Sequence, residues 1–359
     1  MEIKNFKFKF QSIHYQMKDT ITDDDIKNFV TNRPHVFILG AGASKAALPY
    51  GDRNGIECPV MDGFLKKTGL DYILQDTPFQ SLKDNLETIY SALHESGKFP
   101  EKLEALENGV REYFDQLALP FTPTVYDYLL LSLRDKDYIF TFNWDDLLIQ
   151  AYYRVRKITK NLPKIYFLHG NIAMGYCESC AGVVHYLDKY CPKCGKNLIQ
   201  QPLLYPVREK NYHFNPSISN AWHDFLIILK NCSILTIFGY GAPPSDAAAI
   251  DLMKEAFSST FRRYDSIEII DLKPENQLID EWKPFLSPTN YHVECYKDFF
   301  DSLVAKFPRR SIEGCVQTKL NSWFGKSSIE LSPQSSIWEI GDLLQPLIDR
   351  EVNHDYSII

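Results

Sequence analysis

Short apolar runs alternate with amphipathic stretches along most of this chain. The runs are rich in branched and aromatic residues, as buried strands are; they occupy residues 35–40 (HVFILG), 137–143 (DYIFTFN), 164–170 (KIYFLHG), 233–239 (SILTIFG) and 266–271 (SIEIID). Helical spacing is clearest in two of the intervening segments, at 219–231 and 243–259. Strands that alternate with helices predict an α/β fold with a doubly wound parallel sheet.

From about residue 71 to 134 the pattern turns helical, which predicts an insertion that caps the sheet. Within 101–119 the apolar residues recur at intervals of three and four and build one apolar face; they are Leu103, Leu106, Val110, Phe114 and Leu117. Pro123 suits the first turn of a following helix, because a proline there has no hydrogen bond to lose.

Both ends of the chain differ from the central pattern. FKFKF at 6–10 alternates apolar and basic residues, which predicts a half-buried edge strand, and 21–30 predicts a short helix. The tail at 335–350 has helical spacing but contains Pro346, so a kink or break is expected. We therefore divide the chain into an extension (1–33), a main domain (34–307) and a C-terminal extension (308–359). The two extensions are candidates for oligomer or partner contacts.

Composition and charge narrow the class of protein. A chain that is 45% hydrophobic and 24% charged is typical of a globular protein. Its net charge of −7 and scattered basic residues argue against nucleic-acid binding, with Arg262-Arg263 and Arg309-Arg310 only isolated doublets. No run approaches the roughly 20 apolar residues of a membrane span, and the N-terminus has no signal-peptide core. We expect a cytoplasmic protein.

Four of the eight cysteines form a quartet with the spacing C-x2-C-x10-C-x2-C; they are Cys177, Cys180, Cys191 and Cys194. Two such pairs can surround one tetrahedral ion, and thiolates favour zinc. A redox-active disulfide is the alternative. With four thiolates no coordination position stays open, so a zinc module over about 175–198 would be structural, and the catalytic groups must lie elsewhere.

The glycine turn at 40–44 and the polar ends of two strand-like runs are the candidates for that chemistry. Glycines after a strand let a backbone approach a phosphate closely, although a tight turn without a ligand has the same pattern. Asn143 and His169 end runs whose side chains should reach the crevice of an open sheet. His169 can act as a general base near neutral pH, whereas Asn143 can orient a hydroxyl or a water.

Asp146 and either Ser245 or Asp246 are expected as helix caps. Asp146 precedes the helical segment LLIQAYYR, and Ser245 or Asp246 is the candidate N-cap of the helix within 243–259.

Taken in order, these motifs resemble the sirtuin (silent information regulator) family. The glycine turn, Phe142-Asn-Trp-Asp145, His169-Gly170, the cysteine module, Gly239-Tyr240-Gly241 and the strand ending in Asp271 follow one another as in that family. The resemblance covers about 34–273. It implies a Rossmann-like fold that binds NAD as substrate and holds a structural zinc.

The resemblance also implies individual roles. The nucleotide would be bound by Gly40, Ala41, Gly42, Ser44, Gly239, Tyr240 and Asp271, with the last near the adenosine ribose. Asn143 and Asp145 would contact the nicotinamide ribose and carboxamide, and His169 would be the general base. Asp52 and Arg53 lie in a segment that matches a further motif of the family only loosely.

One departure bears on the reaction. Protein deacylases of the family follow the zinc module with a Phe-Gly-Glu segment that pairs with the peptide substrate, and 197–214 has none. The Gly239-Tyr240 turn and Trp222 resemble the sequences of bacterial antiviral NAD hydrolases more than those of the deacylases. Our hypothesis is an NAD glycohydrolase that releases nicotinamide and ADP-ribose. The alternatives are an NAD-dependent protein-lysine deacylase and a non-catalytic NAD- or ADP-ribose-binding module. The resemblance also implies a homo-oligomer, with a companion ATPase or a phage-derived activator.

Overall fold

The computed structural model describes residues 32–185, 189–207, 212, 215–258, 266–283, 285, 292–320 and 329–356. The strand expected at 6–10 and the helix expected at 21–30 lie outside these ranges.

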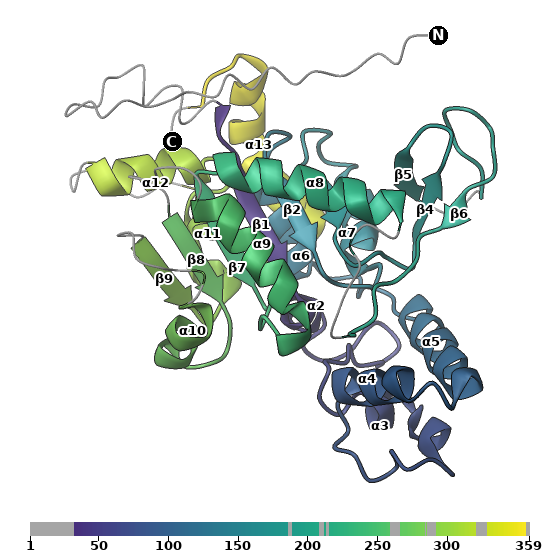
Figure 1. Cartoon of the computed structure of the whole chain (residues 1–359). Helices are drawn as coiled ribbons and strands as arrows, with labels where there is room; N and C mark the ends of the chain where they lie inside the picture. Colours follow the sequence, from purple (N-terminus) through teal and green to yellow (C-terminus); the bar gives the residue numbers. More distant parts are fainter. Residues whose placement is uncertain are drawn as a thin grey trace.

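A six-stranded sheet forms the centre of the molecule, in the order β3-β2-β1-β7-β8-β9 (Figure 1). Every neighbouring pair is parallel. The strands are β1 (His35–Leu39), β2 (Tyr138–Thr141), β3 (Lys164–Phe167), β7 (Ile234–Phe238), β8 (Ser266–Ile270) and β9 (His292–Tyr296). The predicted α/β fold with a doubly wound parallel sheet is confirmed.

Each face of the sheet has its own apolar core, because alternate side chains of a strand point to opposite faces. Phe37 and Leu39 of β1 face the first core, whereas Val36 and Ile38 face the second. The first core is covered by α2 (Ala41–Ala47), α6 (Val125–Ser132), α7 (Leu147–Val155), η3 (Phe299–Asp301) and α11 (Leu303–Lys306). The second is covered by α8 (Pro216–Asn231), α9 (Ala247–Ser258) and α10 (Glu275–Trp282).

The helical segment between β1 and β2 extends the first core beyond the sheet (Figure 1). It contains α3 (Phe64–Thr68), η1 (Asp71–Leu74), α4 (Leu86–Ser96) and α5 (Pro100–Asp115). The predicted apolar face of α5 is confirmed, since Leu106, Val110 and Phe114 are buried. Pro123 does not begin the next helix. Thr124 caps α6 in a capping box with Asp127, which places Pro123 one residue outside the cap.

A small antiparallel sheet, in the order β5-β4-β6, carries the first cysteine pair and lies beside the N-terminal end of α8 (Figure 1). Its strands are β4 (Met174–Cys177), β5 (Gly182–His185) and β6 (Ile199–Gln200).

The C-terminal part packs on the main domain through α12 (Ser311–Leu320) and α13 (Ile337–Val352). A kink or a break was expected at Pro346, and the structure contradicts the break, because α13 continues through Pro346. Pro346 leaves the carbonyl of Asp342 without its helical donor, and both residues are exposed, so water can bind that carbonyl. The Arg309-Arg310 doublet is buried rather than superficial, and both guanidinium groups pair with Glu351.

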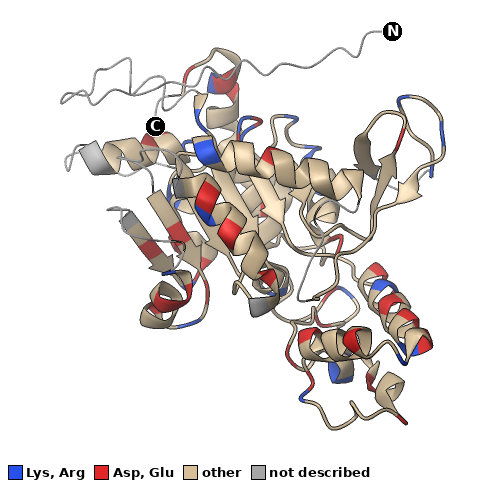
Figure 2. Cartoon of the chain, in the orientation of Figure 1, with Lys and Arg blue, Asp and Glu red and all other residues tan. Residues whose placement is uncertain are grey.

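Charged residues are spread over the described elements (Figure 2). Acids predominate on α5, and Lys and Arg are scattered among other elements. None of the helices in the described ranges combines the length and apolar character that a bilayer span requires.

Candidate functional site

A cavity of about 440 Å³ lies at the carboxyl ends of the central strands. Such a volume is within the range of small-molecule sites, and this edge is where open α/β sheets bind ligands. Its lining includes nine of the predicted site residues, which are Gly40, Ala41, Gly42, Asn143, Asp145, His169, Gly239, Tyr240 and Asp271. Ser44 lies behind the lining, fully buried. Residues far apart in the sequence are therefore brought to one place.

The two glycine turns pack backbone against backbone beneath this cavity. The amide of Gly42 donates to Gly239 O at 2.9 Å. A Cβ on Gly40 would lie 2.6 Å from that same oxygen, and Gly239 has a φ of +61°, so both positions require glycine.

This packing corrects one expectation about the first turn. Of its first four amides, those of Gly40, Gly42 and Ala43 already donate to protein carbonyls. The glycines therefore serve close packing of the two turns more than they present free amides to an anion.

Asn143 is held so that one side of its amide is committed to the protein. Its Nδ2 donates to Gly40 O and to Ser44 Oγ, both at 2.9 Å. Because a carbonyl oxygen can only accept, the donor side of the amide must face Gly40. Oδ1 is then the atom of the Asn143 amide that is available to a molecule in the cavity.

Asp145 is the end of a buried hydrogen-bond chain. Ser44 Oγ donates to Asp145 Oδ2 at 2.7 Å, so the hydroxyl of Tyr126, 2.8 Å from Ser44 Oγ, must be the donor to Ser44. Burial raises the pKa of Asp145 to about 6. Its Oδ1 accepts from the amide of Leu147 at 3.2 Å. Asp146 is the N-cap residue of α7, as expected, although its side chain accepts no bond from the first turn. The prediction missed Tyr126, because one tyrosine in an apolar helix carries no site signal.

His169 is positioned by the turn after β3. Gly170 has a φ of +79°, and a Cβ there would lie 1.9 Å from Pro202 O. Trp222 Nε1 donates to Leu168 O at 2.9 Å and so anchors the residue before His169. The His169 ring meets Phe142 edge-on, with ring centres 4.7 Å apart. The His-Gly pair predicted from the sequence is thus a turn that only glycine permits.

Asp246 lines the cavity, a position that the sequence analysis did not predict for it. Either Ser245 or Asp246 was expected to cap α9. In the structure, Asp246 Oδ2 accepts from the Tyr240 hydroxyl at 2.7 Å. Its Oδ1 lies 3.8 Å from His169 Nε2, and both side chains are buried. Asp246 therefore lines the cavity among the predicted site residues.

The two residues with uncertain roles lie outside the cavity lining. Asp52 accepts the amides of Asn54, Ile56 and Ala118, which ties its loop to the end of α5. Arg53 donates to Leu119 O. Both residues hold the loop in place.

The four cysteines of the quartet come together, with all Sγ atoms within 4.8 Å of one another. Thiolates about 2.3 Å from a tetrahedral zinc lie roughly 3.8 Å apart, so the donor set fits zinc. Cys177 and Cys194 Sγ are 3.5 Å apart, too far for a disulfide. The quartet is not part of the cavity lining.

We expect Cys177→Ser to lower the zinc content from about one ion per chain to near zero, because a hydroxyl is a poor zinc ligand. Elemental analysis of the purified protein measures this. Cys295→Ser, on β9, is the matched control and should keep its zinc. An unchanged zinc content in Cys177→Ser would show that the quartet is not the metal site.

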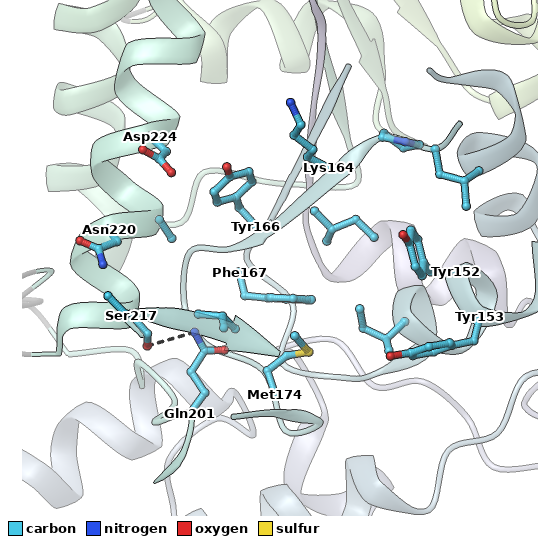
Figure 3. A pocket seen from close by; sticks show the side chains of 17 residues that line it. Tyr152, Tyr153, Lys164, Tyr166, Phe167, Met174, Gln201, Ser217, Asn220 and Asp224 are labelled. Carbon is cyan, nitrogen blue, oxygen red and sulfur yellow. Dashed lines mark hydrogen bonds between the residues drawn. The ribbon is translucent and has the colours of Figure 1, made fainter. Parts of the chain in front are cut away.

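A second cavity, of about 540 Å³, lies between α7, β3 and α8 (Figure 3). Tyr152 and Tyr153 face it from one side and Asp224 from the other, and Gln201 Nε2 donates to Ser217 Oγ at 3.2 Å. None of the predicted site residues lines it. Size alone therefore does not identify the functional site.

The chain is similar to solved structures of Sir2 proteins. A Sir2 homologue in complex with NAD is 14% identical, over 85% of this chain and 98% of that chain, with a TM-score of 0.40. A mutant Sir2 homologue with ADP-ribose is 14% identical, over 85% and 100% of the two chains, with a TM-score of 0.40. A Sir2 structure with a peptide and NAD is 15% identical, over 84% and 100%, with a TM-score of 0.37. No protein-family model and no curated protein matches the chain.

Proposed function

We propose that this chain is an NAD glycohydrolase, which cleaves NAD with water to nicotinamide and ADP-ribose. One observation carries the proposal: Asn143, His169 and the two glycine turns line a single cavity, with Asp271 at the end of β8 in the same lining. These are the motifs whose order resembles the sirtuin family. A binding module would need the glycine turns but not a histidine placed in the cavity with them.

The proposed reaction needs little acid–base chemistry. The bond between the ribose C1′ and the nicotinamide nitrogen breaks, and its electron pair neutralises the pyridinium, so no general acid is required. Water adds to C1′ and gives up a proton. The transition state resembles an oxocarbenium ion, which positioned dipoles and nearby negative charge stabilise. Asn143 Oδ1 can orient the water or a ribose hydroxyl, and His169 can take the proton.

Asp145 would contribute charge. Above its pKa of about 6 the carboxylate is ionised within the cavity lining, where it favours the oxocarbenium ion.

The segment after the zinc module supports hydrolysis over deacylation. Leu203, Leu204 and Tyr205 are buried, and Tyr205 stacks on Tyr90 of α4 with ring centres 4.7 Å apart. The amide of Leu204 donates to His169 O at 2.9 Å. Residues 203–205 pack inward in this way, which favours hydrolysis over the strand pairing by which the family's deacylases hold a peptide.

The wider setting follows from the resemblance to bacterial antiviral NAD hydrolases. We propose a cytoplasmic defence enzyme that acts as a homo-oligomer and depletes NAD once activated, with a companion ATPase or a phage-derived activator as the trigger.

Incubation of the purified full chain with NAD, with and without an acetyl-lysine peptide, tests the reaction. Chromatography follows nicotinamide and ADP-ribose. We expect equal release with and without peptide, and loss of release in His169→Ala. Release that strictly requires the peptide would establish a deacylase instead. Saturable NAD binding by calorimetry without any release, with candidate partners also present, would support the binding module.

A further inference from the structure

His169 is surrounded by rings that do not supply charge. Phe142 meets it edge-on and stacks on Tyr240 with ring centres 4.2 Å apart and planes 3° from parallel. The Tyr212 ring lies 6.3 Å from the His169 ring. Burial raises the pKa of both Tyr212 and Tyr240 above the usual tyrosine range, so both hydroxyls are neutral near pH 7. A charge that acts on His169 must come from another residue.

Asp246 is placed to provide that charge. Its Oδ1 lies 3.8 Å from His169 Nε2, within ion-pair range but longer than a hydrogen bond. Its Oδ2 accepts from the Tyr240 hydroxyl at 2.7 Å, which fixes the orientation of the carboxylate. Both Asp246 and His169 are at least 95% buried, so the attraction between them is weakly screened.

The loop that leads to Asp246 contains one residue in an unfavourable backbone conformation and one hydrogen-bonded turn. Ala242 has a φ of +43°, which is unfavourable for a residue with a Cβ. The amide of Asp246 donates to Pro243 O at 2.8 Å and closes the turn. Strained backbone of this kind persists where the surrounding structure enforces it, and it is common at functional sites.

We propose that Asp246 is the positioning residue of this site, whose carboxylate sets the tautomer and orientation of His169. A carboxylate beside Nε2 favours the proton on that nitrogen, so Nδ1 becomes the nitrogen that can accept a proton. When His169 takes a proton from the attacking water, Asp246 stabilises the imidazolium without itself becoming protonated. This role rests on the proposed hydrolase function, although the pairing itself does not.

Glu87 is an acid of the cavity lining that contacts Ser245, the residue before Asp246. It lies on α4, and its Oε1 accepts from the amide of Ser245 at 2.9 Å. Glu87 is close enough to raise the pKa of Tyr240, after burial and the Asp246 carboxylate. It therefore offers a matched comparison, since Glu87→Gln and Asp246→Asn each remove one negative charge from the same cavity lining.

Histidine-labelled NMR on the full chain measures the pairing without any need for activity. The His169 signal is assigned by its absence in His169→Gln, and the pKa is read from a pH titration. In Asp246→Asn we expect the His169 pKa to fall by about one unit, because the charged imidazolium loses its partner. Glu87→Gln should shift it by less than half as much. An unchanged pKa in Asp246→Asn, or an equal shift in the two variants, overturns the proposal.

Kinetics with NAD then tests the role in the reaction. Because His169 must be neutral to accept a proton, a lower pKa should move the acid limb of the kcat profile to lower pH in Asp246→Asn. The plateau rate should fall about tenfold, the low end of what a general base contributes. An unmoved acid limb would contradict the role even if the rate fell. If the wild-type chain never consumes NAD, the hydrolase proposal fails, while the NMR titration still decides the His169–Asp246 pair.

Discussion

Replacement of Asn143 by alanine is expected to reduce NAD cleavage about 10²- to 10³-fold, the usual loss when one preorganised dipole is removed from a reacting centre. The amide is held by Gly40 O and Ser44 Oγ, so its Oδ1 has a fixed place in the cavity lining. The effect should fall mainly on kcat, because many other groups line the cavity and would still bind NAD. Steady-state nicotinamide release measures the effect.

Asn171→Ala is the matched control for Asn143→Ala. Asn171 is also a buried asparagine whose Nδ2 donates to a site carbonyl, Asp145 O at 2.5 Å, but it does not line the cavity. Each substitution leaves one carbonyl without its side-chain donor, at a cost of about 1–3 kcal/mol in stability. Comparable melting temperatures with very different rates would show a direct role for Asn143. Retention of more than about a tenth of the wild-type rate in a folded Asn143→Ala would contradict that role.

Replacement of Arg309 by methionine should lower the free energy of unfolding by about 3–5 kcal/mol, as expected when one partner of a buried ion pair is removed. Arg309 is fully buried and donates to both oxygens of Glu351, at 2.7 and 2.6 Å. It also donates to Leu131 O and Leu133 O, which join the tail to the main domain. Chemical denaturation measures the change.

The same pair predicts how stability depends on pH. Burial acts to raise the pKa of Glu351, but the bonds and charges of Arg309 and Arg310 outweigh it, and the pKa lies below its usual value. A carboxylate with a lowered pKa stabilises the fold above the unfolded pKa of about 4.5, and this contribution is lost as the pH falls through the folded pKa. Arg309→Met should therefore weaken the loss of stability in acid.

Arg350→Met is the control for this substitution. Arg350 pairs with Asp355 at 3.6 Å on the surface, with 41% and 47% of the two side chains exposed. Exposed pairs contribute about 0–1 kcal/mol, so the change should be small. Equal destabilisation by the two substitutions would show that the buried Arg309–Glu351 pair does not stabilise the packing of the C-terminal part on the main domain.

Local sequence pattern was sufficient for five of the six strands of the main sheet, but it did not give β9. The five apolar runs at 35–40, 137–143, 164–170, 233–239 and 266–271 all contain strands of the main sheet. The prediction failed at two prolines, where the surrounding structure outweighed the local preference of proline. Pro346 sits inside α13 because its helix face is exposed, and Pro123 lies before the cap because Thr124 and Asp127 form a capping box.

By itself, the sequence determined the parallel sheet, the cysteine quartet and the identity of Asn143 and His169 as residues at strand ends. Each follows from spacing within a short segment, where composition and periodicity act directly. Only the tertiary structure decided what surrounds them. It brings Tyr126 behind Ser44 and Asp246 beside His169, and it buries Arg309 against Glu351. These pairs join residues from separate elements, so their hydrogen bonds and charges exist only once the sheet has brought the strand ends and loops together.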